Sequence, residues 1–253
     1  MKITFLGTGT SQGVPLIGCE CKVCRSPDPK DKRLRSSVML ETNGNTFVID
    51  TGPDFRQQML RENVKKLDAV IFTHEHKDHI AGLDEVRAFN YLNGKEMDVY
   101  ATARVQEALK REFAYVFSGV DYPGIPKIKL HTISRIPFDV NGTLFTPVEV
   151  FHMHLPVSGY RIGDFTYITD ANFIGDVEKE KIKGSKVIVL NALRKEKHPS
   201  HYTLDEAIAL LKELAPEKAY LIHISHQLGK HAEIAKELPS FIQCAFDGLK
   251  IEV

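Results

Sequence analysis

The chain has no excess of charge of either sign. Its 253 residues include 33 Lys and Arg and 33 Asp and Glu, so the formal net charge at pH 7 is zero. A protein without a net positive field has no long-range attraction for nucleic acid. The sequence also has no apolar run near the roughly 18 residues that a membrane span requires. We therefore expect neither a nucleic-acid nor a membrane partner.

The N-terminus lacks the features of a secretory leader, because residues 1–9 have no apolar h-region and no small-residue cleavage site. A cytoplasmic protein is therefore expected. Three of the four cysteines lie together in Cys19-Glu-Cys21-Lys-Val-Cys24. In a reducing compartment such a cluster is better explained by a metal ion than by disulfides. Repeats, linkers and low-complexity segments are also missing, which predicts one domain over residues 1–253.

Short strand and helix patterns alternate in both halves of the chain. Apolar, β-branched runs predict strands over 67–73, 165–169 and 219–224, and helical patterns cover 103–117 and 204–214. Strands with intercalated helices in each half predict a mixed α/β (α+β) fold.

The strongest motif follows directly after the strand predicted over 67–73. It is Thr73-His-Glu-His-Lys-Asp-His79, which places three imidazoles and one carboxylate within six positions. Such a set supplies ligands for two cations about 3.5–4 Å apart when further ligands come from elsewhere. Two cations lower the pKa of a water to about 7 and hold a phosphoryl or acyl oxygen. The motif therefore predicts a two-metal hydrolase.

This His-x-His-x-Asp-His loop resembles the signature of the metallo-β-lactamase superfamily. The resemblance implies a four-layer αββα sandwich and a set of ligands for two metal ions. The implied ligands in the loop are His74 and His76 for one metal, and Asp78 and His79 for the other. Three later ligands are also implied, namely a histidine, a bridging aspartate and a last histidine. Asp170 and His223 each end an apolar run and fit the last two positions.

The middle histidine has two candidates, His152 and His154, in Phe151-His152-Met-His154. Residues two apart on a strand face the same side, so alternation does not separate them. In relatives the ligand lies some six or seven residues before a Gly-Tyr pair, here Gly159-Tyr160. This spacing favours His152. His154 stays open as a neighbour of the ligands or as a substrate contact.

The spacing of Cys19, Cys21 and Cys24 suits one tetrahedral zinc ion, which needs a fourth ligand. This run and the later His-x-x-His pair resemble the PhnP-type branch of the superfamily, which contains the cyclic-phosphate phosphodiesterases of phosphonate degradation. The resemblance implies that the three thiolates and His226 hold a structural zinc, in a segment at about 13–35. Cys244 is expected to pack as a small buried apolar residue.

The same resemblance implies a metal-dependent phosphodiesterase that cleaves a small or cyclic phosphodiester with a metal-activated water. Asp78 is expected to serve as both ligand and base, and His201 as the general acid, with His198 as the alternative. Expected cofactors are two divalent ions, Mn or Zn, and one structural Zn. The expected partner is the small substrate, with a homodimer as an option.

Two other functions stay open. One is a transfer-RNA 3′-processing endonuclease, against which the neutral net charge argues. The other is a non-catalytic carrier or binding protein, like a relative in quinone-cofactor biosynthesis that keeps the cysteine zinc site and loses the catalytic motif. Because all seven positions of the two-metal set can be filled here, the sequence favours an enzyme.

Overall fold

The computed structural model describes residues 1–120 and 122–253. It contains two sheets, and the first is built mainly from the N-terminal half of the chain. The strand order is β15-β1-β2-β3-β4-β5-β6. These strands are β1 (Lys2–Gly7), β2 (Ser37–Thr42), β3 (Asn45–Ile49), β4 (Ala69–Ile71), β5 (Met97–Thr102), β6 (Ile128–Ile133) and β15 (Lys250–Glu252). Strands β3 to β6 are parallel, so their carboxyl ends meet at one edge of the sheet.

The second sheet follows the order β11-β8-β9-β10-β12-β13-β14, with β7 paired to β8. Its strands are β7 (Phe138–Val140), β8 (Thr143–His152), β9 (Leu155–Ile162), β10 (Phe165–Tyr167), β11 (Phe173–Ile174), β12 (Val187–Asn191), β13 (Lys218–Ile222) and β14 (Ile242–Cys244). Strands β10, β12, β13 and β14 are parallel, and their carboxyl ends also share an edge.

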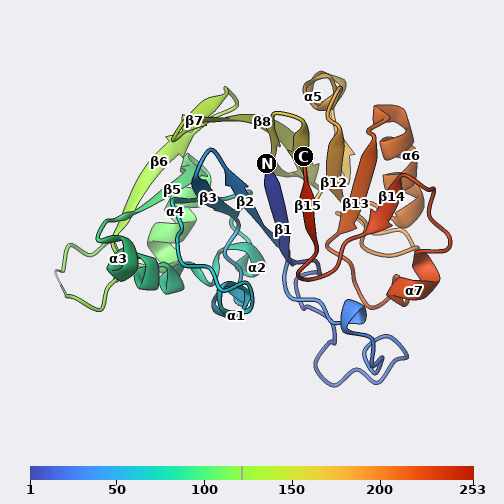
Figure 1. The fold of residues 1–253 in the computed structure, drawn as a ribbon, viewed down its shortest axis with the longest axis horizontal. Coiled ribbons are helices and arrows are strands. Elements are labelled where there is room, and N and C mark those ends of the chain that lie inside the picture. The colour runs from blue at the N-terminus through green and yellow to red at the C-terminus, as the bar shows by residue number, and fades with distance from the viewer. Residues whose placement is uncertain (121) are drawn as a thin grey trace.

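Helices cover the outer face of each sheet (Figure 1). On the first sheet lie α1 (Phe55–Arg61), α2 (Lys77–Ile80), the 3-10 helix η2 (Leu83–Val86), α3 (Arg87–Asn93) and α4 (Ala103–Glu112). On the second lie α5 (Asp176–Ile182), α6 (Leu204–Leu214) and α7 (His231–Ile234), while the 3-10 helix η1 (Pro29–Asp31) belongs to the cysteine segment. The predicted αββα four-layer sandwich is confirmed.

Three apolar clusters fill the spaces between these four layers. The central cluster lies between the sheets and includes Tyr160, whose hydroxyl donates to the carbonyl oxygen of Phe72 at 2.6 Å. The outer clusters lie between each sheet and its helices, and include Leu109 of α4 and Leu211 of α6. The Tyr160 bond crosses from the second sheet to the chain just before the histidine motif. Packing between the sheets therefore fixes where that motif begins.

Two of the differences from the sequence prediction concern α4 and β5. The helix predicted over 103–117 ends at Glu112, because Phe113 leaves the helical conformation (φ −116°, ψ 43°) and turns into the core. Strand β5 was not predicted, although Met97, Val99 and Ala101 are buried in alternation with less buried neighbours. That period of two is a strand signal which the sequence does contain.

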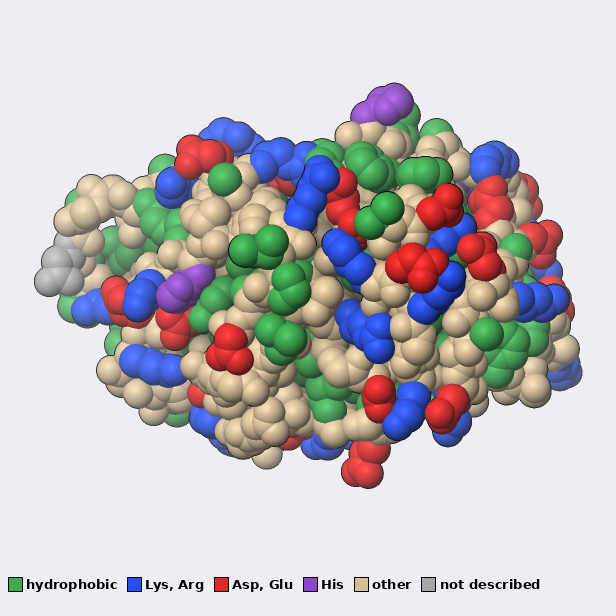
Figure 2. Space-filling view, turned by 90° about the horizontal axis from the view of Figure 1, so that it is seen from above, with side chains coloured by type: hydrophobic (Ala, Val, Ile, Leu, Met, Phe, Trp, Pro, Cys, Tyr) green, Lys and Arg blue, Asp and Glu red, His purple; other side chains and the backbone are tan. Residues whose placement is uncertain are grey.

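The outer surface agrees with the balanced composition. Basic and acidic side chains are interspersed over the face shown in Figure 2. In the part of the chain that the structure describes, no helix combines the length and the apolar character needed to cross a bilayer.

Candidate metal centre

Several donors of the predicted two-metal site, and Asp50, which supports them, lie where parallel strands end. Asp50 follows β3 and His74 lies in the loop after β4, while Asp170 and His223 follow β10 and β13 of the other sheet. Asp50, Asp170 and His223 have φ values of 65°, 54° and 54°, in the left-handed region. For residues other than glycine this conformation costs about 1–3 kcal/mol each and is frequent at functional sites. The two sheets thus present strained, polar strand ends to each other.

Asp50 organises the histidine loop from beneath. It is fully buried, and its Oδ1 accepts from the backbone N–H of Thr73 at 2.8 Å. Its Oδ2 accepts from Thr73 Oγ1 and from His79 Nδ1, both at 2.7 Å. Burial raises the pKa of Asp50, and these bonds to the carboxylate act against that rise. One carboxylate therefore fixes the positions of two neighbouring side chains.

These bonds also determine which ring nitrogens are free. His79 Nδ1 must carry a proton to donate to Asp50, so in the neutral ring the lone pair lies on Nε2. The Thr73 hydroxyl donates its proton to Asp50, so it can only accept from His74 Nδ1, at 3.0 Å. His74 Nδ1 therefore carries the proton, and the lone pair of the neutral ring lies on Nε2. Both Nε2 atoms are buried without a hydrogen-bond partner among the described residues. Buried lone pairs of this kind are suited to a metal ion.

Four donors form one group around His79. Ligand atoms of Asp78, His79, Asp170 and His223 lie within 4.8 Å of one another. His79 Nε2 lies 3.1 Å from Oδ2 of both Asp78 and Asp170, and His223 Nδ1 lies 3.2 Å from Asp170 Oδ2. Burial lowers the pKa of His79, but Asp78 and Asp170 raise it well above its usual value, so without a cation the ring favours a proton on Nε2 as well. A divalent cation among these groups would take the place of that proton between His79 Nε2 and the two carboxylates.

The other histidines form a second group beside the first. The ring centroid of His76 lies 4.6 Å from that of His74 and 5.2 Å from that of His152. His152 Nδ1 donates to the carbonyl oxygen of Ser200 at 2.8 Å, so its Nε2 also keeps a lone pair. Asp170 can join this side too, because its carboxylate lies within 4.8 Å of donor atoms of His152 and His201. Asp170 is therefore common to the group around His79 and to a set with His152 and His201.

The structure separates the two candidates for the middle histidine. Strand β8 ends at His152, which pairs with Leu155 of β9. Met153, with φ of 58°, begins the turn that also contains the exposed His154. The alternation rule does not extend through a turn, so the two side chains do not share a face. His152 lies among the donors, and His154 lies outside the groups described above.

His201 lies closer to the donors than His198 does. The ring centroid of His201 is 4.5 Å from that of His152 and 4.8 Å from that of His223. His198 lies one ring further out, 5.1 Å from His201, and its Nδ1 is 3.4 Å from the Ser200 backbone N–H. Burial, together with the neighbouring His223, lowers the pKa of His201 to about 2, so its side chain is neutral at pH 7.

Some supporting residues are absent from the sequence prediction. Asn191, at the end of β12, accepts from the Ala171 backbone N–H at 2.8 Å and donates to the Ala171 carbonyl at 2.9 Å. This bidentate contact fixes the residue that follows Asp170. Ser36 Oγ lies 3.3 Å from His223 Nδ1. Asn191 ends an apolar strand, the same signal that points to Asp170, whereas Ser36 gives no comparable signal.

The cysteine segment brings together the four residues predicted for the structural zinc. Ligand atoms of Cys19, Cys21, Cys24 and His226 lie within 4.8 Å of one another. His226 Nδ1 lies 3.4 Å from Cys19 Sγ and 3.3 Å from Cys21 Sγ. Three thiols and one imidazole in such a cluster match the donor set of a structural zinc site. Cys244 is buried elsewhere.

Without a cation, the thiols of this segment do not all ionise readily, because their pKa values are shifted in opposite directions. A hydrogen bond from the Cys24 backbone N–H lowers the pKa of Cys21 to about 6, whereas burial raises the pKa of Cys24 to about 11. The small apolar cluster here contains only Val14, Val23 and Cys24 as fully buried members. The donors fit a zinc ion. Because the apolar core of the segment is so small, a bound zinc would contribute to its folding stability.

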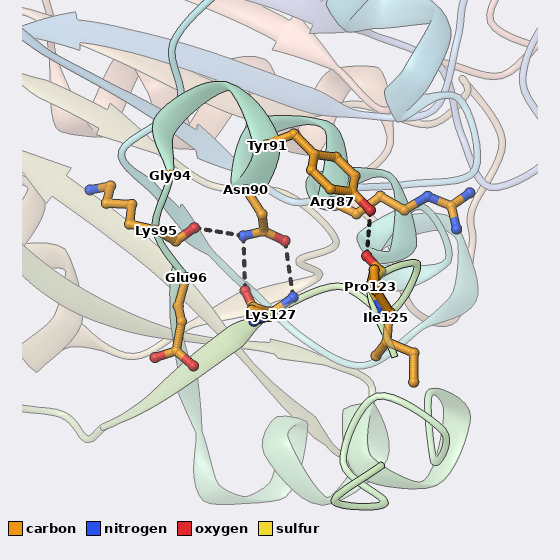
Figure 3. Close-up of a pocket in the computed structure, with 9 residues that line it drawn as sticks. All are labelled: Arg87, Asn90, Tyr91, Gly94, Lys95, Glu96, Pro123, Ile125 and Lys127. Carbon is orange, nitrogen blue, oxygen red and sulfur yellow. Dashed lines mark hydrogen bonds between the residues drawn. The ribbon is translucent and has the colours of Figure 1, made fainter. Parts of the chain in front are cut away.

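Two arginines that could bind a phosphate, Arg87 and Arg194, are engaged in contacts away from the metal donors. Arg87 lines a pocket of about 640 Å³ between α3 and the chain before β6 (Figure 3). It donates to the Gly124 carbonyl at 3.3 Å and pairs with Asp84 at 3.5 Å. None of the residues drawn in Figure 3 belongs to the metal-donor groups. Arg194 donates to Gln227 at 2.9 Å in the loop beside His198.

Comparison with known proteins assigns this geometry to a family. The family described as "Beta-lactamase superfamily domain" matches residues 45–224, which include both halves of the dinuclear donor set. The chain belongs to this superfamily. A solved structure named "Crystal Structure of a New Diphosphatase from the PhnP Family" has a TM-score of 0.94 and 42% identity, covering 100% of this chain and 97% of that one. The predicted superfamily and the resemblance to its PhnP-type branch are confirmed.

Other relatives agree in fold and differ in name. Zn²⁺-bound PqqB from Methylobacterium extorquens has a TM-score of 0.82 at 19% identity, covering all of both chains, which shows a shared fold. A protein named octanoyltransferase from Porphyromonas gingivalis is 40% identical over 99% of this chain, but the chain spans only 51% of that protein. A ribonuclease Z from Methanococcus maripaludis is 25% identical over 94% of this chain and 72% of that protein. Together with the PhnP-family diphosphatase, family membership supports a metal-binding hydrolase.

Proposed function

We propose that this chain is a two-metal phosphodiesterase that cleaves a small or cyclic phosphodiester. The observation that carries the proposal is the place of Asp170, whose carboxylate belongs to two donor groups at once. A carboxylate shared by two groups is the arrangement that a dinuclear centre requires. The proposed ligands are His74, His76, Asp78, His79, His152, Asp170 and His223, holding two ions of Mn or Zn. A structural zinc is proposed at Cys19, Cys21, Cys24 and His226.

A pair of divalent ions, when bound, supplies a water of lowered pKa and neutralises charge on the phosphoryl oxygens. The chain itself supplies preorganisation. Asp50 holds the proton of a neutral His79 on Nδ1, so that Nε2 is the nitrogen available to a metal, and the Ser200 carbonyl does the same for His152. Asp78, a ligand at the edge of the site, is placed to accept the proton of the attacking water. Because these positions are fixed before substrate arrives, little reorganisation is needed during the reaction.

The leaving oxygen needs a proton, and we assign its delivery to His201. His201 is buried beside His152 and His223, whereas His198 is separated from them by the His201 ring. The low pKa of His201 means that its ring is neutral before the reaction. His201 can act as the acid only after it has taken up a proton, and we assign as its source the proton that the attacking water gives up to Asp78; His201 then passes this proton to the leaving oxygen.

A second substrate class, a small diphosphate, is favoured by the PhnP-family structure. That protein is named a diphosphatase and is 42% identical over the whole of this chain. Cleavage of a phosphoanhydride places the same demands on the donors, since water again attacks phosphorus. The anhydride leaving group is a weaker base than an alkoxide and has less need of an acid, so His201 would matter less.

The remaining relatives suggest functions that the observations favour less. Ribonuclease Z shares 25% identity, and the zero net charge of this chain gives no general attraction for transfer RNA. A non-catalytic carrier does not require a complete set of ligands for two metal ions, and this chain has one. The octanoyltransferase is about twice as long as the matched region, and its other half is an equal candidate for that activity.

Turnover by metal-reconstituted protein tests the proposal. Bis(p-nitrophenyl) phosphate, a cyclic nucleotide, a dinucleoside diphosphate and a precursor transfer RNA would be compared. We expect metal-dependent hydrolysis of a small diester and a loss of roughly 10²-fold or more in Asp78→Ala. Asp176→Ala, at a side chain 99% exposed, is the matched control. Turnover of the diphosphate alone would select the second substrate class, and no metal-dependent turnover of any small phosphate ester would refute both.

A further inference from the structure

Helix α4 forms ion pairs with two charged residues of the metal loop, Glu75 and Lys77, which alternate with the metal ligands. Glu75 and Lys77 stand between the donors in His-Glu-His-Lys-Asp. Arg104, near the start of α4, places Nη2 3.2 Å from Glu75 Oε2. Glu112, the last residue of α4, forms an ion pair with Lys77. The loop is therefore attached at two points to a single rigid element.

Arg104 also reaches the other sheet. The same Nη2 donates to the carbonyl oxygen of Pro156 at 2.6 Å. Pro156 lies in β9, within the hairpin whose preceding strand ends at His152. One guanidinium nitrogen thus joins the loop that carries His74 and His76 to the hairpin that carries His152.

The position of Glu112 supports a tertiary role for these pairs. The C-terminus of a helix carries partial negative charge and favours a cation, so a terminal glutamate is locally unfavourable. Here Lys77 compensates it from the metal loop, and Arg111 Nε lies 3.5 Å from its other oxygen. A residue that opposes its local preference and is compensated by a distant partner indicates a requirement set by the tertiary structure.

We propose that Arg104 is a positioning residue that sets the geometry of His74, His76 and His152, which are the histidines proposed for one of the two metals. The inference rests on the proposed dinuclear site and concerns one half of it. Arg104 contacts Glu75 and Pro156, whereas His79 has a support of its own in the bond from its Nδ1 to Asp50. Removing Arg104 should therefore weaken one metal position selectively.

Metal affinity measured by titration of Mn²⁺ or Zn²⁺ into chelator-treated protein tests this inference. Loss of a supporting contact around metal ligands lowers affinity by about 10–100-fold, and Arg104→Ala should show this loss at one of the two catalytic positions. Arg104→Lys keeps a charged donor and should recover most of the affinity. Lys110→Ala is the matched control, since Lys110 lies on the same helix and pairs with Glu107 at 2.9 Å.

Folding is expected to change little, because the Arg104 side chain is 40% exposed and such ion pairs contribute weakly to stability. Glu75→Gln provides a second variant that removes the pair without altering the helix, and it should also lower one affinity. Unchanged affinities in both variants, within about two-fold, would overturn the inference. So would equal loss at every metal position, which would indicate general destabilisation. Metal binding without phosphodiesterase activity in the wild type would refute the proposed function alone.

Discussion

The substitution Asp50→Asn changes the hydrogen bonds beneath the metal loop while keeping nearly the same side-chain shape. Asp50 accepts three hydrogen bonds, from the Thr73 backbone, the Thr73 hydroxyl and His79 Nδ1. Asparagine keeps one acceptor oxygen and replaces the other with an amino group that only donates. With its oxygen on the Thr73 N–H, its amino group faces His79 Nδ1, which must then accept. The His79 proton moves to Nε2, and that nitrogen can no longer bind a metal.

The expected size follows from this change. Loss of a partner that orients a ligand costs about 10–100-fold in metal affinity or activity. That range corresponds to about 1.4–2.7 kcal/mol. Metal titration and kcat/KM at a fixed metal concentration measure the effect, and nitrogen NMR of His79 reports the tautomer. Asp54→Asn is the control, because Asp54 accepts from the Arg35 backbone at 2.8 Å and lies outside the donor groups. Wild-type metal affinity in Asp50→Asn would refute the tautomer argument.

Other substitutions test single roles. Cys21→Ser should release about one zinc and lower Tm, because zinc binding in such a segment contributes folding free energy; an unchanged zinc count by elemental analysis would contradict this. His152→Ala should lower metal content and kcat/KM by about tenfold or more, whereas His154→Ala should match the wild type. In steady-state kinetics, His201→Ala should lower kcat by about 10²–10⁴-fold with metal retained, and His198→Ala much less. The reverse order would assign the proton to His198.

The donors at strand ends could be predicted because each follows an apolar run. The strand predicted over 219–224 overlaps β13, which ends at Ile222, so His223 comes directly after the observed strand. The sequence does not reveal that Asp170 and His223 adopt left-handed backbone conformations, because tertiary contacts impose that strain. It also gives no distances, so the sharing of Asp170 between two donor groups required the structure.

The choice between His152 and His154 depended on where a strand ends. Alternation treats both as members of one strand, but Met153 begins the turn and ends the period of two. Spacing to the Gly-Tyr pair favoured His152 through resemblance alone. The contact from Arg104 to Pro156 joins residues 52 positions apart, and no local pattern in the sequence predicts it. Long-range contacts of this kind are what a single sequence does not specify.

Anomalous X-ray diffraction from metal-loaded crystals tests the central claim most directly. The account predicts two peaks with Asp170 between them, one near His74, His76 and His152 and the other near Asp78, His79 and His223. A third peak, at the zinc absorption edge, is predicted inside the cysteine cluster. A single ion at the histidine site, or two ions that do not share the Asp170 carboxylate, would contradict the proposed dinuclear centre.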